Sequence, residues 1–325
     1  MKVQETSLRT IKFNPAEKLT LIYILITGIV ACYLWITKGK GVELIGIRLA
    51  ISSVIVGMAS FENSSKRTSN QLLRYIFIGC LFVYWYPETF YFNRYFGNFD
   101  FLLAGADHKM FGYQPSWDFA LAYPQRWFSE LMNMGYISFF PILIITCLYL
   151  YYTDPRLADF FFFTTTLAFF LFYILFMIFP ASGPQYYFQL IDTRQISAGI
   201  FPPVGDYFSH HYLSLKDTPS TGIFKQSLDL IKSIAERPTG AFPSSHIGNS
   251  TLVIIILAAN RKYKLTILLL PLYCLLVLST VYIQAHYFVD LIGGFAAAFV
   301  FYPLSKYLYP IFAKKRQLMT DHQKI

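Results

Sequence analysis

Eight apolar stretches constrain this chain more than any other feature, because each approaches the roughly 20 residues that an α-helix needs to cross a bilayer. Hydrophobic residues make up 55% of the 325 residues and charged residues only 14%. This composition is too apolar for an ordinary soluble domain of that length. The sequence predicts an all-α polytopic membrane protein with about eight transmembrane helices, at residues 19–36, 42–61, 72–92, 131–152, 160–179, 246–259, 265–285 and 288–309.

Lysine and arginine gather in alternate connections between these stretches, which places the N-terminus in the cytoplasm by the positive-inside rule. The short connection at 38–41 disagrees, while the connections at 93–130 and 180–243 are long enough to cross regardless of charge. The net charge of +9 fits this topology and attraction to anionic lipid headgroups, and it does not indicate nucleic-acid binding. We expect an integral protein of the plasma or inner membrane.

The two long connections differ in kind. Residues 99–128 mix aromatic side chains with acidic ones such as Asp100 and Asp107, which is typical of amphipathic helices lying at the membrane interface. Residues 181–241 contain turn residues and scattered charges, and we expect them to form an extracytoplasmic cap.

Two short polar motifs interrupt the apolar sequence. Residues 243–246 read Pro-Ser-Ser-His, and residues 286–290 read His-Tyr-Phe-Val-Asp. Ionisable groups near lipid are costly, so they point to function. Two helices of about 20 residues, each rising about 30 Å, separate the motifs and return His246 and His286 to the same, extracytoplasmic face.

The spacing within these motifs indicates acid–base or nucleophilic chemistry. His286 and Asp290 are four residues apart, so they share a helical face and the carboxylate can fix the imidazole tautomer. An imidazole oriented in this way is a nucleophile or a base. Pro243 and Ser244 suit a helix start, where free N–H groups favour an anion. A phosphate held there would lie beside His246.

Together with Ser279 and Thr280, these motifs resemble the second and third signature motifs of the type 2 phosphatidic acid phosphatase superfamily. Residues 240–246 and 286–293 are most similar to its inositol phosphorylceramide synthase branch. The resemblance implies a six-helix lipid phosphatase or phosphotransferase core over 71–325, including the cap at 181–241. It does not cover the first two helices, which would form a two-helix extension over 1–70.

The resemblance also implies roles for individual residues. His286 matches the nucleophile that forms a phosphohistidine, Asp290 its orienting partner, and His246 the general acid that then acts as base for the acceptor. Ser244, Ser245 and neighbouring amides match phosphate-binding positions. No metal and no cofactor are implied, and the expected partner is a phospholipid substrate within the membrane, with a lipid alcohol as the second substrate in the case of transfer.

The chain departs from the superfamily pattern at its basic residues. Thr280 stands where the phosphatases carry an arginine after the serine of the third motif, and the first motif is absent in its usual form. Lys232 and Arg237 instead precede the second motif. We expect Arg237 to replace the missing phosphate clamp, because a guanidinium can bind phosphate through two hydrogen bonds, with Lys232 as a second cation.

The acceptor remains open. Transfer of a phospho-alcohol to a lipid hydroxyl, as in sphingolipid synthesis, and simple hydrolysis of a lipid phosphate or polyprenyl diphosphate would use the same residues. Two readings from other classes are a metal-dependent hydrolase, since two histidines and a carboxylate can form a metal-binding triad, and a proton-coupled transporter. The clustering of the polar groups at one membrane face argues against the transporter.

Overall fold

The computed structural model describes residues 11–60, 67–211 and 222–321. Within these ranges the chain forms helices and connecting segments and has no β-strand. The predicted all-α class is confirmed.

Among the described helices, five are long and apolar enough to cross a membrane, or six if one pair bent by 42° is counted as a single span. The five are α1 (Pro15–Lys38), α2 (Val42–Ser60), α8 (Pro155–Ile178), α14 (Tyr263–Tyr282) and α15 (Phe288–Asp321), and the bent pair is α6 (Arg126–Ile137) with α7 (Phe139–Thr153).

The two remaining predicted spans fall on α3 (Arg67–Asn93) and on α13 (Ser245–Ala259), whose 15 residues are fewer than a full crossing needs. The helices are those of an integral membrane protein. They are consistent with the predicted number of eight spans, which stays a prediction.

The chain divides into two compact units, Met1–Leu81 with Lys306–Ile325, and Phe82–Ser305. In the first unit α1 packs against α2, and Glu17 forms a buried ion pair with Arg74. The arginine predicted within the second span, Arg48, is only 4% exposed and donates hydrogen bonds to side-chain and backbone oxygens inside this unit. The boundary at residue 70 that the sequence favours stays a prediction.

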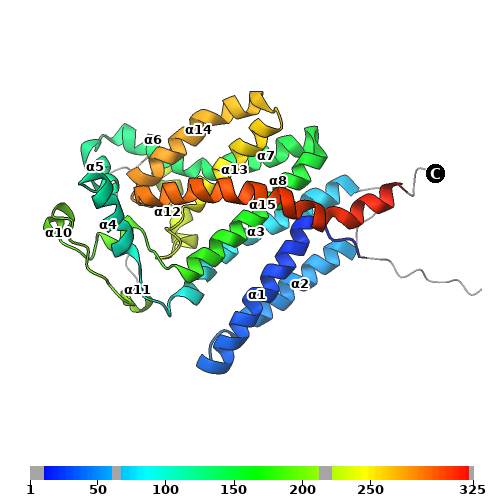
Figure 1. Ribbon diagram of the computed structural model, residues 1–325, viewed down its shortest axis with the longest axis horizontal. Coiled ribbons are helices and arrows are strands. Elements are labelled where there is room, and N and C mark those ends of the chain that lie inside the picture. The colour runs from blue at the N-terminus through cyan, green and yellow to red at the C-terminus, as the bar shows by residue number, and fades with distance from the viewer. Residues whose placement is uncertain (1–10, 61–66, 212–221, 322–325) are drawn as a thin grey trace, which may run out of the picture. The chain divides into compact units, whose positions relative to one another are not determined.

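The second unit is built around α13, which packs against α7, α8 and α14, while α6 lies along α14 and α12 (Ile223–Ala235) (Figure 1). Helix α13 has an apolar interior face on which Ile247, Leu252 and Val253 are completely buried. The helix that carries His246 of the second motif is therefore enclosed by other helices of this unit.

Two further groups of helices fill the long connections. Helices α4 (Asp100–Phe111) and α5 (Pro115–Ala122) occupy the first connection. Its aspartates Asp100 and Asp107 are completely buried, so neither lies on a solvent-facing side of α4. The prediction of interfacial helices over 99–128 stays a prediction. The second connection contains α12 and three short helices, α9 (Pro184–Tyr187), α10 (Thr193–Ser197) and α11 (Tyr207–His210).

Gly294 lets α15 approach the start of α13. A Cβ atom at this position would lie 2.6 Å from the carbonyl oxygen of Ser244 and 3.0 Å from Cβ of Ile247. Contacts this short with backbone cannot be relieved by rotating a side chain, so the two helices would have to move apart.

The Gly294→Ala variant should therefore be less stable by roughly 1–3 kcal/mol and less active, because α13 and α15 each carry part of the histidine site. Thermal unfolding in detergent and turnover measure the two effects. Gly57→Ala is the matched control, because nothing lies within 4 Å of its added Cβ. Wild-type stability and activity in Gly294→Ala would contradict the expected close contact.

Candidate active site

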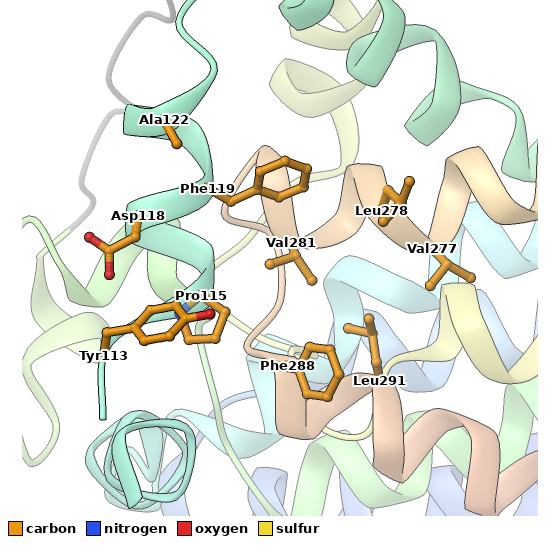
Figure 2. A pocket seen from close by; sticks show the side chains of 10 residues that line it. All are labelled: Tyr113, Pro115, Asp118, Phe119, Ala122, Val277, Leu278, Val281, Phe288 and Leu291. Carbon is orange, nitrogen blue, oxygen red and sulfur yellow. The ribbon is translucent and has the colours of Figure 1, made fainter. Parts of the chain in front are cut away.

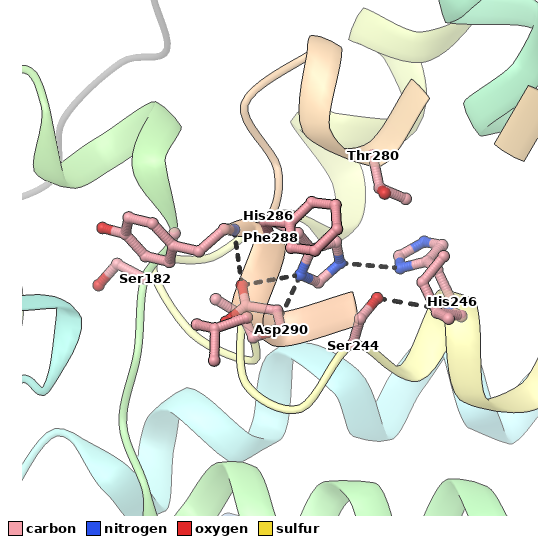
Figure 3. Close-up of polar contacts among 12 residues, drawn as sticks. Ser182, Ser244, His246, Thr280, His286, Phe288 and Asp290 are labelled. Carbon is pink, nitrogen blue, oxygen red and sulfur yellow. Dashed lines mark hydrogen bonds and ion pairs between the residues drawn. The ribbon is translucent and has the colours of Figure 1, made fainter. Parts of the chain in front are cut away.

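The two predicted histidines meet in the second unit. His286 lies in the connection between α14 and α15, and His246 lies in the first turn of α13. Nε2 of His286 is 3.5 Å from Nδ1 of His246 (Figure 3). Residues 40 positions apart in sequence thus come together, as the helical hairpin between them predicts.

The tautomer of His286 is set mainly by a backbone carbonyl. Nδ1 of His286 lies 2.8 Å from the oxygen of Ala241 and 3.4 Å from Oδ2 of Asp290. Because a carbonyl oxygen can only accept, Nδ1 carries the proton and Nε2 keeps its lone pair. Burial lowers the pKa of His286 to about 4, although the hydrogen bond to Ala241 opposes this shift. The imidazole is therefore neutral at pH 7.

Asp290 lies behind His286. Its Oδ2 accepts a 2.8 Å hydrogen bond from the amide of Tyr287, and its contact with Nδ1 of His286 is longer. The side chain is completely buried. Asp290 thus caps the first turn of α15 and also faces the protonated nitrogen of His286, which is the position expected of an orienting carboxylate.

The start of α13 offers free amides. The Ser244 hydroxyl accepts from the amide of Ile247 at 3.4 Å, and the amide of Ser244 donates to the carbonyl of Asp290 at 3.0 Å. In the parts of the chain that the structure describes, the amides of Ser245 and His246 have no acceptor. Two unpaired donors at the positive end of a helix dipole form a site for an anion.

Aromatic side chains hold the ring of His246. Its centroid lies 4.6 Å from the ring of Tyr136 and 4.6 Å from the ring of Phe139. These two residues flank the bend between α6 and α7. The direction of the His246 ring is thus fixed by packing at that bend.

A small cavity joins the two histidines. Its volume is about 10 Å³, which is room for a single water molecule. A phosphoryl group is larger than this cavity, so lining side chains must move for one to bind. The cavity is lined by Tyr86, Tyr136, Ser182, Gln185, Glu236, Thr239, Gly240, Ala241, Ser245, His246, Ala285 and His286.

Glu236 is a cavity residue that the sequence did not single out. Its Oε1 accepts a 3.0 Å hydrogen bond from Gln185, whose own side-chain oxygen accepts from Nζ of Lys232 at 2.8 Å. Burial raises the pKa of Glu236 and lowers that of Lys232. Its position in sequence between Lys232 and Arg237, two predicted phosphate-binding residues, is the signal that could have identified Glu236 as a site residue.

The predicted cations stand next to the cavity and do not line it. Lys232 reaches it through Gln185, and the guanidinium of Arg237 donates to the carbonyl of Glu236 at 2.6 Å. Thr280 is completely buried, and its hydroxyl donates to the carbonyl of Val277 at 2.8 Å. Of the predicted phosphate-binding groups, Ser245 and the α13 amides are therefore the ones that lie directly at the histidines.

The metal-site alternative finds no matching geometry. Asp290 faces Nδ1 of His286, on the side away from His246, so the three side chains do not point at one common position. Among the described residues, no group of three histidine, cysteine or acidic side chains could hold a metal ion.

A second cavity, of about 380 Å³, lies where α5, α14 and α15 meet (Figure 2). Its wall is mostly apolar and includes Phe119, Val281, Phe288 and Leu291, with Asp118 as its one charged residue. Phe288 follows His286 by two positions, so this cavity adjoins the loop that carries the histidine.

The comparison with protein families decides the identity of the chain. A sequence model described as the PAP2 superfamily matches residues 103–304, a region that contains both histidines and Asp290. The chain belongs to the PAP2 superfamily. This is the superfamily that the two motifs predict, and membership indicates a lipid-phosphatase-type enzyme acting on phosphoric esters. The search of the curated proteins and the search of the solved structures found no match.

Proposed function

We propose that this PAP2 protein transfers a phosphoryl or phospho-alcohol group from a phospholipid through a phosphohistidine at His286. Nε2 attacks phosphorus, the bond from phosphorus to the departing oxygen breaks, and His246 gives that oxygen a proton. An acceptor hydroxyl then attacks the phosphohistidine while His246 takes its proton, and the phosphorus–nitrogen bond breaks. The acceptor is water in hydrolysis and a lipid alcohol in transfer.

One observation carries this proposal. The unprotonated Nε2 of His286 faces His246 at 3.5 Å, beside the unpaired amides at the start of α13. Nucleophile, proton donor and anion-binding amides therefore lie together at one small cavity. Such an arrangement meets the geometric requirements for covalent transfer of a negatively charged group.

Two features support a lipid substrate and transfer to a lipid alcohol. The apolar cavity beside Phe288 borders α14 and α15, which are long and apolar enough to lie in the membrane, and an acyl chain matches its lining. Thr280 in place of an arginine, together with the sequences at 240–246 and 286–293, favours the inositol phosphorylceramide synthase-like branch. In this proposal Arg237 and Lys232 neutralise the bound phosphate from the edge of the site.

A product assay tests the proposal. Purified protein is incubated with phospholipids labelled in the headgroup phosphate, with and without ceramide, and with long and short acyl chains. We expect a new labelled lipid only when ceramide is present, and faster turnover of the long-chain donors. Free phosphate or a free phospho-alcohol in both reactions would show that the protein hydrolyses its substrate and does not transfer the group to ceramide. If neither reaction gave a labelled product, the proposed enzymatic activity would be contradicted.

We further propose that the site faces the extracytoplasmic side, as the distribution of basic residues predicts. In a cysteine-free background, a cysteine at the exposed Lys264, in the first turn of α14, should react with an impermeant reagent only after the membrane is opened. A cysteine at the exposed Arg194, in α10, should react in intact cells or vesicles of native orientation. The reverse pattern would place the site in the cytoplasm.

A further inference from the structure

Helix α4 carries two aspartates that the mechanism does not use. Asp100 and Asp107 are seven residues apart, which is about two helical turns, so they share one face of α4. Both side chains are completely buried. A buried carboxylate is costly unless it is well hydrogen-bonded, and its partners therefore show what it holds in place.

Asp107 holds the segment that follows the nucleophile. Its Oδ2 accepts from the amide of Phe288 at 2.7 Å, and its Oδ1 accepts from the amide of Val289 at 2.9 Å. The amide of Tyr287 donates to Asp290. Burial raises the pKa of Asp107 to about 6, although the two amide hydrogen bonds oppose this shift, so the group is largely ionised at pH 7. Three consecutive amides after the nucleophile are each bound by a carboxylate.

Asp100 holds the segment that leads to the tautomer-setting carbonyl. Its two oxygens accept from the amides of Ser182 and Gly183, at 2.7 and 2.8 Å. In the same segment, the carbonyl of Ala181 accepts from the amide of Ala241 at 3.0 Å. The carbonyl of Ala241 is the group that accepts from Nδ1 of His286. Asp100 is thus connected to the imidazole through two backbone segments.

We propose that Asp100 and Asp107 are positioning residues for the catalytic histidine. One face of α4 fixes both the loop that carries His286 and the carbonyl that determines which ring nitrogen stays free. Neither aspartate lines the small cavity, so neither touches the reacting group. The kinetic part of this inference rests on the proposed function, whereas the orientation of the ring does not.

The Asp107→Asn variant tests the inference. A carboxamide has one acceptor oxygen, and its NH₂ group would face the second backbone amide, donor against donor. We expect kcat to fall on the order of 10–100-fold, because small misplacements of reacting groups have effects of that size, with KM changed less than about 2-fold. The ¹⁵N resonances of the His286 ring, recorded without substrate, should shift or broaden.

Asp192→Asn is the matched control. Asp192 is an exposed carboxylate that accepts from the amide of Arg194 at 2.9 Å at the start of α10, and among the described residues its hydrogen bonds stay within that turn, away from both histidines. Its replacement should leave kcat, KM and the His286 resonances unchanged. The control therefore distinguishes the loss of Asp107 from the loss of any carboxylate that caps a helix.

The outcomes discriminate between positioning and folding. Wild-type kcat and unchanged His286 resonances in folded Asp107→Asn would overturn the proposal. If Asp107→Asn does not fold, the same measurements on Asp100→Asn test the proposal, and unchanged His286 resonances in that variant would overturn the proposal. Loss of folded protein in both variants would assign the aspartates to folding alone. An inactive wild-type protein would instead refute the proposed function, and the ring resonances would still test the positioning.

Discussion

Replacing His286 with alanine should lower turnover by roughly 10⁴-fold or more, because no other group can supply the attacking nitrogen. In the wild type, a short incubation with phosphate-labelled substrate followed by denaturation should yield labelled protein that loses its label in acid and keeps it in base. The variant should yield none. The neutral, singly protonated ring of His286, with Nε2 facing the cavity, is the physical basis for both results.

His210→Ala is the matched control for this experiment. The His210 side chain is 68% exposed and pairs with Asp206 on the surface, so its removal should leave turnover and labelling intact. Full activity in His286→Ala, or acid-stable label on another residue, would contradict the phosphohistidine mechanism. Asp290→Asn should lose less activity than His286→Ala, because the Ala241 carbonyl still holds the proton on Nδ1.

Replacing His246 with alanine should have the second-largest effect, and its size should depend on the leaving group. On a natural lipid the loss should be roughly 10²–10⁴-fold, the usual contribution of general acid catalysis. A nitrophenyl phosphate leaves readily without a proton, so on this substrate the loss should be only about 10-fold or less. Turnover of both substrates by wild type and variant measures the difference.

The comparison with His286→Ala completes the assignment of roles. That variant should be inactive on both substrates, since no leaving group replaces a missing nucleophile. Equal losses on the two substrates in His246→Ala would show that His246 acts mainly by binding phosphate. Its position in the first turn of α13, beside the unpaired amides, makes this the relevant alternative.

The helical class and the meeting of the histidines could be predicted because both depend on regular geometry. Apolar length predicts helices, and two successive membrane helices return a chain to the face from which it started. The short helix α13 shows the limit of that reasoning. Its 15 residues are enclosed by α7, α8 and α14, and hydropathy does not distinguish a helix buried by protein from one buried by lipid.

The surroundings of the site could not be predicted, because they depend on contacts between distant backbone atoms. The carbonyl of Ala241 binds a ring 45 residues away, and any residue could supply that carbonyl. Asp107 binds amides 181 and 182 residues away. Its aromatic neighbours in sequence favoured an interfacial helix. The sequence alone does not show whether an aspartate is buried or exposed to solvent, because that depends on tertiary packing.

The enclosed side of His286 has a consequence for stereochemistry at phosphorus. Ala241 and Asp290 occupy the Nδ1 side of the ring, so a phosphoryl group is accessible to the chain's nucleophile only from Nε2. The departing oxygen and the incoming acceptor must then use the same apical position, opposite that nitrogen. Each in-line displacement inverts the configuration, and two in succession restore it. With a substrate whose phosphorus is made chiral by sulfur and oxygen isotopes, we therefore expect the product to retain the configuration at phosphorus.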